Sequence, residues 1–349
     1  MSAIEYRYST LLTPSQDETG GLCDGIPVRK HIDSDLEEIG TFKAQQDWMK
    51  YVQEVQNYKG GLGPKHSFMA VSLPECLPDR FEIVSYANEF AFLHDDVTDI
   101  LDQENADIEN DEVLEAFLEG ARNGSIDALK CGKRRMQAKI LNTMIAIDRP
   151  RAMVAVRAWA SFMEQGAGRQ HHRRFCGLDE YLPYRCEDVG HMFWYALVTF
   201  GCAITIPENE TSLCAELVVP ALTAASLTND LFSYEKELEA AQLAGLPDVV
   251  NALWVLMHEH NISLEDAKLR CRLRIKKEVM EYSRIVKETL VRNDLSKESK
   301  SVQDIIKQHN TMSANYNGQG RESQKSIPSE RPRMAVWHRR GGLARHTAM

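Results

Sequence analysis

Three aspartates lie within five residues of one another, at Asp95, Asp96 and Asp99. On a helix, Asp95 and Asp99 share one face and Asp96 lies beside them. Like charges at this spacing repel one another, so we expect a cation to compensate them. Mg²⁺ prefers such oxygen ligands and usually binds one or two carboxylates together with phosphate oxygens of a substrate. The competing interpretation is a solvated acidic helix end that runs into the acidic segment 102–112.

A second set of oxygen donors follows in residues 229–237. Asn229, Ser233 and Glu237 stand at positions i, i+4 and i+8, so a helix places amide, hydroxyl and carboxylate oxygens in one row. These ligands also suit Mg²⁺. Lys236 adjoins the row, where its ammonium can reach a phosphate bound to the same ion. The competing interpretation is an exposed polar helix, but the small apolar residues 221–228 before the row indicate a buried one, and buried polar groups need partners.

Together the two motifs predict a clamp for several Mg²⁺ ions around a diphosphate, and their pairing resembles that of class I terpene cyclases. The resemblance is closest to the N-terminal cyclase domain of fungal bifunctional enzymes that fuse a cyclase to a prenyltransferase, and it extends over about residues 1–316. It is carried by Tyr-Arg-Tyr-Ser at 6–9, Gly-Leu-Cys-Asp-Gly-Ile-Pro-Val-Arg at 21–29, Leu-Gly-Pro-Lys-His-Ser-Phe-Met-Ala at 62–70, Pro-Glu-Cys-Leu-Pro-Asp-Arg at 74–80, Ser-Tyr-Ala-Asn-Glu-Phe-Ala-Phe-Leu-His-Asp-Asp at 85–96 and Gln-Ala-Lys at 137–139. It implies an all-α, single-domain helical bundle with a central apolar active-site cavity.

The resemblance also implies roles for residues that spacing alone leaves undecided. Arg185 matches the arginine that senses diphosphate, Asp188 the linker residue, and Val189 the residue whose carbonyl faces the leaving group at a helix break. An arginine fork suits this role because it binds phosphate oxygens bidentately. Without the resemblance, Arg185 is interpreted as half of a surface ion pair. The family usually closes its site with a C-terminal Arg-Tyr pair, but here Tyr316 follows Asn315, so Tyr316 alone remains a candidate contact.

Aromatic side chains are expected to complete such a site. Ionisation of a prenyl diphosphate leaves an allylic carbocation, and aromatic faces stabilise cations. The candidates are Phe68, Phe92, Phe193, Trp194 and, if the C-terminal segment folds back, Trp337. Plain core packing competes with this role at each position.

Helices must position all of these residues. Apolar residues recur at helical spacing and no alternating run is bounded by hairpin turns, so we predict an all-α chain of about ten helices after an irregular arm at 1–30. The expected segments are 33–58, 79–101, 109–121, 127–146, 149–167, 178–204, 210–241, 246–259, 263–293 and 299–314. Asp79 is expected to be the N-cap of the second.

Charge and composition limit the partners and the compartment. The chain has 349 residues and a net charge of −10, which argues against nucleic acid as a partner. Residues 317–349 carry +5 and 1–316 carry −15, so we predict a basic, flexible C-terminal tail beyond the cyclase domain. Eight scattered cysteines predict free thiols, hence a cytoplasmic location. We expect no signal peptide and no transmembrane segment, because the apolar stretch 192–206 is shorter than a span.

The predicted activity is Mg²⁺-dependent ionisation and cyclisation of a linear isoprenoid diphosphate. By resemblance, the substrate is geranylgeranyl (C20) or geranylfarnesyl (C25) diphosphate, the metal is three Mg²⁺ ions, and the product is a polycyclic di- or sesterterpene. A prenyltransferase module or a separate enzyme would supply the substrate, and a homodimer is one possible assembly. The alternatives are an all-α chain-elongating prenyltransferase, which Asn229 and Ser233 disfavour because that class needs a second aspartate-rich motif, and a non-catalytic, degenerate cyclase-like protein.

Overall fold

A computed structural model of the chain describes residues 5–13, 19–55, 58, 60–63, 66–98, 101, 103–164, 174–188, 190–243 and 248–318. Of 191, 192, 240, 243 and 308–318 it describes the backbone. The described part is built almost entirely from helices, as the sequence predicts. They are α1 (Asp35–Tyr51), α2 (Phe68–Ser72), α3 (Pro78–Thr98), α4 (Gln103–Asn123), α5 (Gly132–Glu164), α6 (Leu178–Asp188), α7 (His191–Gly201), the short 3₁₀ helix η1 (Glu208–Glu210), α8 (Thr211–Leu217), α9 (Val219–Leu243), α10 (Ala252–His260), α11 (Leu264–Val291) and α12 (Lys297–Gly318).

The N-terminal arm contains structure that the sequence analysis missed. Strands β1 (Ser9–Leu11) and β2 (Arg29–His31) form an antiparallel pair. Each has only three residues, too few to show the alternation that marks a strand. A carboxylate anchors the arm, because Glu75 accepts hydrogen bonds from the backbone N–H groups of Arg7 (2.8 Å) and Tyr8 (3.2 Å). The described residues of the arm are therefore attached to the bundle at Glu75.

Several predicted helices have different ends or breaks in the structure. The segments expected at 127–146 and 149–167 both correspond to parts of α5, and the predicted division between them is confirmed, because Asp148 (φ −155°, ψ 86°) leaves helical geometry just before Pro150. The single helix expected at 178–204 is two helices, since Gly190 adopts a left-handed conformation (φ 75°) at the start of α7. Asp79 lies inside the first turn of α3 instead of capping it. The break at Gly190 lies two residues after Asp188, a predicted site residue.

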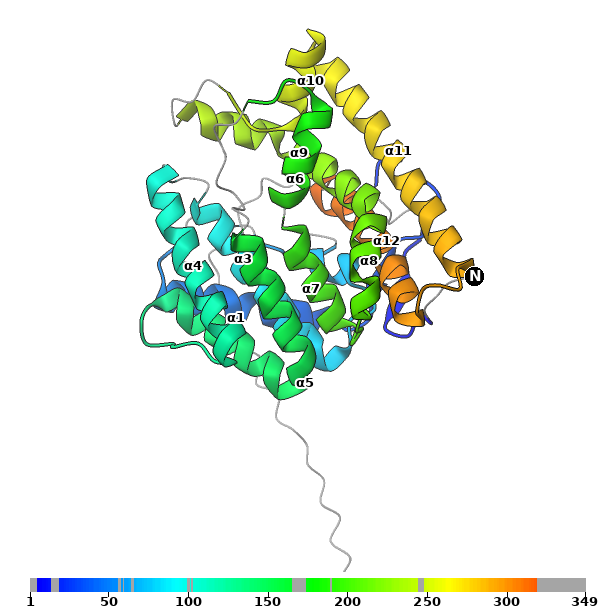
Figure 1. The fold of residues 1–349 in the computed structure, drawn as a ribbon. Helices are drawn as coiled ribbons and strands as arrows, with labels where there is room; N and C mark the ends of the chain where they lie inside the picture. The colour runs from blue at the N-terminus through cyan, green and yellow to red at the C-terminus, as the bar shows by residue number, and fades with distance from the viewer. Residues whose placement is uncertain are drawn as a thin grey trace, which may run out of the picture.

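Two groups of buried side chains hold the bundle together. The larger lies among α1, α3, α5 and α7 and includes Trp48, Phe81 and Trp159; the smaller lies among α6, α9, α10 and α11 and includes Tyr181 and Leu253. Helix α9 belongs to both, with its first turn in the larger group and its middle in the smaller. Figure 1 shows α6 and α7 following one another through the centre of the bundle. The metal-ligand row of the sequence analysis therefore lies on a helix that joins the two cores.

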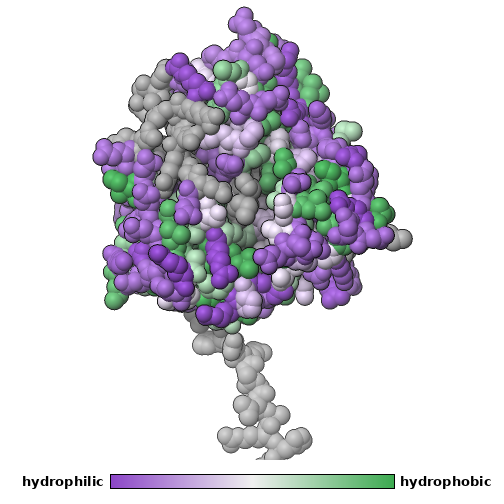
Figure 2. Space-filling view, in the orientation of Figure 1, coloured by the Kyte–Doolittle hydropathy of each residue, from purple (hydrophilic) through white to green (hydrophobic). Residues whose placement is uncertain are grey.

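Close helix packing and a polar outer surface complete the fold. Gly40 of α1 lies against α3 so closely that a Cβ there would meet the carbonyl oxygen of Glu82 at 2.2 Å. The face in Figure 2 is mostly hydrophilic, with hydrophobic side chains gathered toward the side of α8 and α12. Within the part of the chain that the structure describes, no helix has by itself the length and apolarity of a membrane span; residues 208–217 and 219–239, bent by 46°, pass only as a pair and only by length and composition.

Candidate active site

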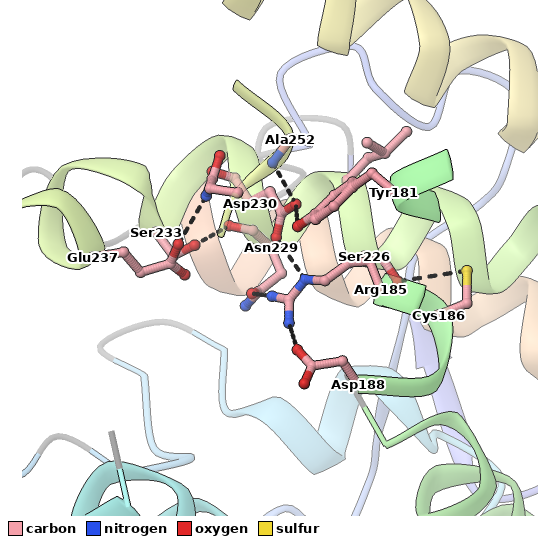
Figure 3. Close-up of polar contacts among 12 residues, drawn as sticks. Tyr181, Arg185, Cys186, Asp188, Ser226, Asn229, Asp230, Ser233, Glu237 and Ala252 are labelled. Carbon is pink, nitrogen blue, oxygen red and sulfur yellow. Dashed lines mark hydrogen bonds and ion pairs between the residues drawn. The ribbon is translucent and has the colours of Figure 1, made fainter. Parts of the chain in front are cut away.

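The oxygen row on α9 forms as the spacing predicts. Asn229, Ser233 and Glu237 are partly buried and succeed one another along the helix (Figure 3). The Ser233 hydroxyl donates to the backbone carbonyl of Asn229 at 2.8 Å, which leaves its oxygen lone pairs available to a ligand. The Asn229 amide oxygen, the Ser233 hydroxyl and the Glu237 carboxylate are three hard oxygen donors on one face. Their chemistry fits Mg²⁺.

Arg185 links α6 to this row. Its Nη2 donates to the Asn229 side-chain oxygen at 2.8 Å, its Nη1 to Asp188 at 2.5 Å and its Nε to Asp230 at 2.9 Å (Figure 3). Only 12% of the Arg185 side chain is exposed. Burial alone lowers the pKa of Arg185, but the carboxylates around it, Asp230 foremost, outweigh burial and hold the pKa well above its usual value. Arg185 is therefore a fixed, charged fork beside the predicted metal ligands and not one half of a surface ion pair.

Asp230 is a central residue of the site to which the sequence analysis assigned no role. Its side chain is completely buried, and besides Arg185 it accepts hydrogen bonds from the Tyr181 hydroxyl (2.6 Å) and the backbone N–H of Ala252 (2.9 Å). Burial, followed by the charge of Asp230, raises the pKa of Tyr181 well above its usual value, so the hydroxyl remains a donor. A carboxylate inside a buried helix was a signal in the sequence, because such a charge persists only with partners.

Asn251 is the second residue without an assigned role. Its side-chain amide donates to Glu237 Oε2 at 2.9 Å and to the backbone carbonyl of Asp230 at 3.0 Å. Its side-chain oxygen accepts the N–H of Leu253 and so caps α10. Burial, and after it the charge of Asp230, raises the pKa of Glu237, whereas Arg185 and the Asn251 hydrogen bond lower it. The last position of the oxygen row is therefore oriented from α10.

The aspartate motif stands at the C-terminal end of α3 and is more open. Asp95 is exposed, and the Asp96 side chain is 39% exposed. Lys236 of α9 reaches across, with its Nζ 3.3 Å from an Asp96 oxygen. This ion pair brings the α3 and α9 motifs to neighbouring positions. Among the described residues, no three acidic, histidine or cysteine side chains converge on one point, and Asp99 lies outside them.

A buried polar chain supports the aspartate motif from behind. His94 Nε2 is 2.9 Å from the side-chain oxygen of Asn110 on α4, and His94 Nδ1 is 3.4 Å from Lys133 Nζ on α5. Burial, and then the Lys133 charge, lowers the pKa of His94 to about 4. His94 is thus neutral at pH 7 and ties the end of α3 to its neighbours.

Three of the four described aromatic candidates come together beside α3. The rings of Phe68 and Phe92 meet edge to face at 5.0 Å, and those of Phe68 and Trp194 at 6.1 Å. Phe193 instead packs on Trp159, with ring centroids 5.0 Å apart. The cluster of Phe68, Phe92 and Trp194 draws on α2, α3 and α7, and Phe92 lies about one turn before Asp95.

Helix α2, which carries Phe68, is held by a buried carboxylate. Glu37 of α1 is completely buried and accepts the backbone N–H groups of Met69 and Ala70, both at 2.7 Å. Burial raises the pKa of Glu37 to about 8 against the opposing effect of these two N–H groups. The position of Phe68 thus depends on a residue of another helix.

Four predicted site residues cannot be compared with the structure. Asp99, Val189 and Trp337 lie outside the described residues, as does the whole tail segment 319–349. Tyr316 lies in the last turns of α12, where the backbone alone is described.

Residues 86–281 match the family model described as terpene synthase family 2, C-terminal metal binding. The chain belongs to the terpene synthase family. The match contains both motifs, Arg185 and Asn251, so the polar groups described above lie inside the part of the family fold that is described as metal binding.

Relatives of this terpene synthase include fungal enzymes. It is 48% identical over 297 residues to the bifunctional type I diterpene synthase tndC of Aspergillus flavipes, covering 85% of this chain and 39% of the relative. It is 45% identical to fusicoccadiene synthase of Phomopsis amygdali, covering 84% and 41%, and 40% identical to ophiobolin F synthase oblA of Cochliobolus heterostrophus, covering 98% and 46%. The chain thus spans less than half the length of these relatives.

A solved terpene synthase shares the fold. Aristolochene synthase from Penicillium roqueforti superposes with a TM-score of 0.63 at 17% identity, over 80% of this chain and 94% of that one. The all-α class I terpene synthase bundle expected from the sequence is thereby confirmed.

Proposed function

We propose that this terpene synthase binds a linear isoprenoid diphosphate with Mg²⁺, ionises it and cyclises the resulting carbocation to a polycyclic terpene. The contact between Arg185 and Asn229 is the observation that supports this most directly. The guanidinium of Arg185, the proposed phosphate-binding group, lies 2.8 Å from the side-chain oxygen of Asn229, a proposed metal ligand. The names of the relatives, which include diterpene and sesterterpene synthases, support geranylgeranyl (C20) or geranylfarnesyl (C25) diphosphate as substrate.

The residues would divide the work as follows. Asn229, Ser233 and Glu237 would hold one part of a three-ion Mg²⁺ set, and Asp95 with Asp99 the other part. When bound, the metal neutralises the diphosphate as negative charge develops on the leaving group. Arg185 and Lys236 would add donors to the same phosphate oxygens, and Asp188 would pass the orientation of Arg185 to Val189.

The aromatic residues would act on the carbocation. Phe68, Phe92 and Trp194 offer ring faces and edges next to the end of α3, where the diphosphate would be bound. Ring faces stabilise a passing cation and exclude water that would quench it. Phe193, which packs on Trp159, would be a further aromatic contact for the substrate, and Tyr316 of α12 would contact the diphosphate.

In this proposal residues 1–316 are the cyclase unit and 317–349 an appended basic tail. A prenyltransferase, as a fused module or a separate enzyme, would supply the substrate. The matched relatives are about twice as long as this chain, and one is named bifunctional, which supports such a supply.

The proposal is tested by product analysis. The purified chain is incubated with C15, C20 and C25 prenyl diphosphates and Mg²⁺, and extracts are analysed by gas chromatography with mass spectrometry. We expect a cyclic hydrocarbon or alcohol from the C20 or C25 substrate and none when a chelator is present. Addition of isopentenyl diphosphate tests the prenyltransferase alternative, which would give longer linear diphosphates. Absence of any cyclic product from a folded sample would refute the proposal.

A further inference from the structure

Asp230 cannot itself bind substrate or metal. Its side chain has no exposed surface, and both carboxylate oxygens are already occupied. Oδ1 accepts Arg185 Nε, whereas Oδ2 accepts the Tyr181 hydroxyl and the Ala252 N–H. Its donors therefore come from two helices, α6 and α10. Any contribution of Asp230 to catalysis must pass through the groups that it holds.

Two contacts of Arg185, those to Asp230 and Asn229, differ in how easily they can change. Asp230 is fixed by two further donors, so the Nε contact has a rigid partner. Asn229, which accepts Nη2, is only partly buried, and its oxygen is the atom that a metal ion would need. A divalent cation at that oxygen repels the guanidinium. The Nη2 contact must then break, while the Nε contact to Asp230 persists.

The buried contacts around Asp230 also support Glu237, the carboxylate of the oxygen row. Asn251 binds Glu237 Oε2 with the amide that also binds the Asp230 backbone carbonyl. The next residue, Ala252, donates its N–H to the Asp230 side chain. The first turn of α10 thus contacts α9 at two points, one leading to Arg185 and one to Glu237. The Asn251 hydrogen bond thus fixes one oxygen of the Glu237 carboxylate.

We infer that Asp230 and Asn251 are positioning residues that together support Arg185 and the metal ligands Asn229 and Glu237. Asp230 is the fixed contact about which Arg185 turns from Asn229 toward the diphosphate. This inference rests on the proposed function, since it takes the ligand of Arg185 to be a diphosphate bound with Mg²⁺. It predicts that metal binding at Asn229 and diphosphate binding at Arg185 are coupled through Asp230. Loss of Asp230 therefore weakens a site whose own ligating residues are all intact.

The test measures the affinity for inorganic diphosphate with Mg²⁺ by calorimetry in wild type, Asp230→Asn, Arg185→Ala and the double variant. The conservative change Asp230→Asn retains the shape of the side chain but replaces one accepting oxygen with an NH₂ group, which then faces the N–H and O–H donors of its neighbours. We expect its Kd to rise at least tenfold, and we expect the double variant to bind no more weakly than Arg185→Ala alone. Residues that act through one another give such non-additive effects. Additive losses would show that Asp230 acts independently of Arg185 and would overturn the inference.

Three further variants guard against a general loss of structure. Asp179→Asn is the matched control, since Asp179 lies on α6 with a side chain that is 97% exposed, and it should leave Kd unchanged. Tyr181→Phe removes one donor to Asp230 and should raise Kd in the same direction but less, which decides the matter if Asp230→Asn does not fold. Asn251→Ala should raise the Mg²⁺ concentration for half-maximal diphosphate binding more than threefold. Unchanged diphosphate binding in Tyr181→Phe and an unchanged Mg²⁺ requirement in Asn251→Ala would contradict the proposed positioning role of Asp230 and Asn251.

The binding measurements also separate this inference from the proposed function. If the wild type binds Mg²⁺ and diphosphate but forms no cyclic product from any prenyl diphosphate, the proposed function fails, and the variant series still decides the role of Asp230. If product forms and the series is additive, the inference alone fails. If the wild type binds no diphosphate, both are wrong.

Discussion

The two oxygen-donor faces of the molecule differ in how their side chains are held. On α9, Asn229 and Glu237 accept hydrogen bonds from α6 and from the residue that caps α10, and the carboxylate between them is completely buried. At the end of α3, Asp95 is exposed, and Asp96 contacts a Lys236 side chain that is itself 71% exposed. Exposed ion pairs contribute little to stability, so the α3 face costs little to rearrange when a cation arrives. The α9 face is built before the ligand arrives, whereas the α3 face can adapt to it.

The largest loss of turnover is expected from a substitution on the α9 face. Asn229→Ala removes a predicted metal ligand together with the acceptor of Arg185, and we expect kcat to fall by about 10³-fold, the upper range for removal of an electrostatic contact to the transition state. Turnover measured with a C20 or C25 diphosphate checks this. Circular dichroism should show unchanged helix content. Activity within tenfold of wild type would remove Asn229 from the site.

A smaller loss, with a different signature, is expected on the open face. Asp95→Ala should lower turnover by about 10²-fold and raise the Mg²⁺ concentration needed for half-maximal activity. Because Asp95 is exposed, the free energy of unfolding should stay within about 0.5 kcal/mol of wild type. Chemical denaturation checks the second part. A large loss of stability would mean that the α3 face is as rigidly built as the α9 face, and the contrast would disappear.

Of these three substitutions, loss of the Lys236–Asp96 ion pair that joins the two faces should reduce turnover least. Lys236→Met removes the contact to Asp96 and one positive charge near the diphosphate, so we expect about a tenfold loss in kcat/KM that shrinks as salt is added. Steady-state kinetics at low and high ionic strength check this. Lys268→Met serves as control, because Lys268 of α11 pairs with Glu235 of α9 and with Glu265, neither of which is a predicted site residue. An effect equal to that of Asn229→Ala would assign Lys236 to the prebuilt face.

A stability measurement sharpens the comparison without involving turnover. Glu37, like Asp230, is completely buried. Burial raises the pKa of Glu37 to about 8, so between about pH 4.5 and 8 the folded state keeps a proton that the unfolded state has lost. Stability should therefore decline as pH rises from about 5 to 8, by at most a few kcal/mol. Denaturation of wild type and Glu37→Gln across this range checks the sign. The variant should show a smaller decline, and an equal decline would assign the pH dependence to other groups.

The helical architecture and the oxygen row were predictable because they depend on spacing along one chain segment. Asn229, Ser233 and Glu237 share a face in any helix that contains them. The role of Asp230 was not predictable in this way, since it depends on Tyr181 and Ala252, which only the packing of α6 and α10 brings to it. Asn251 gives no more signal than an ordinary helix cap. The two strands were missed because three-residue strands show no alternation. Helical spacing predicted one segment at 178–204, whereas the family resemblance implied a helix break at Val189, next to the left-handed Gly190.

The clamp of Glu37 on α2 has a consequence for the position of Phe68. Helix α2 has five residues, too few to be stable alone, and takes its place from a carboxylate on α1 that accepts two of its N–H groups. Substitutions around position 37 move Phe68 together with its whole helix and leave α9 untouched. Under the proposed function, a change around position 37 would alter how Phe68 meets the substrate while the oxygen row on α9 stays in place.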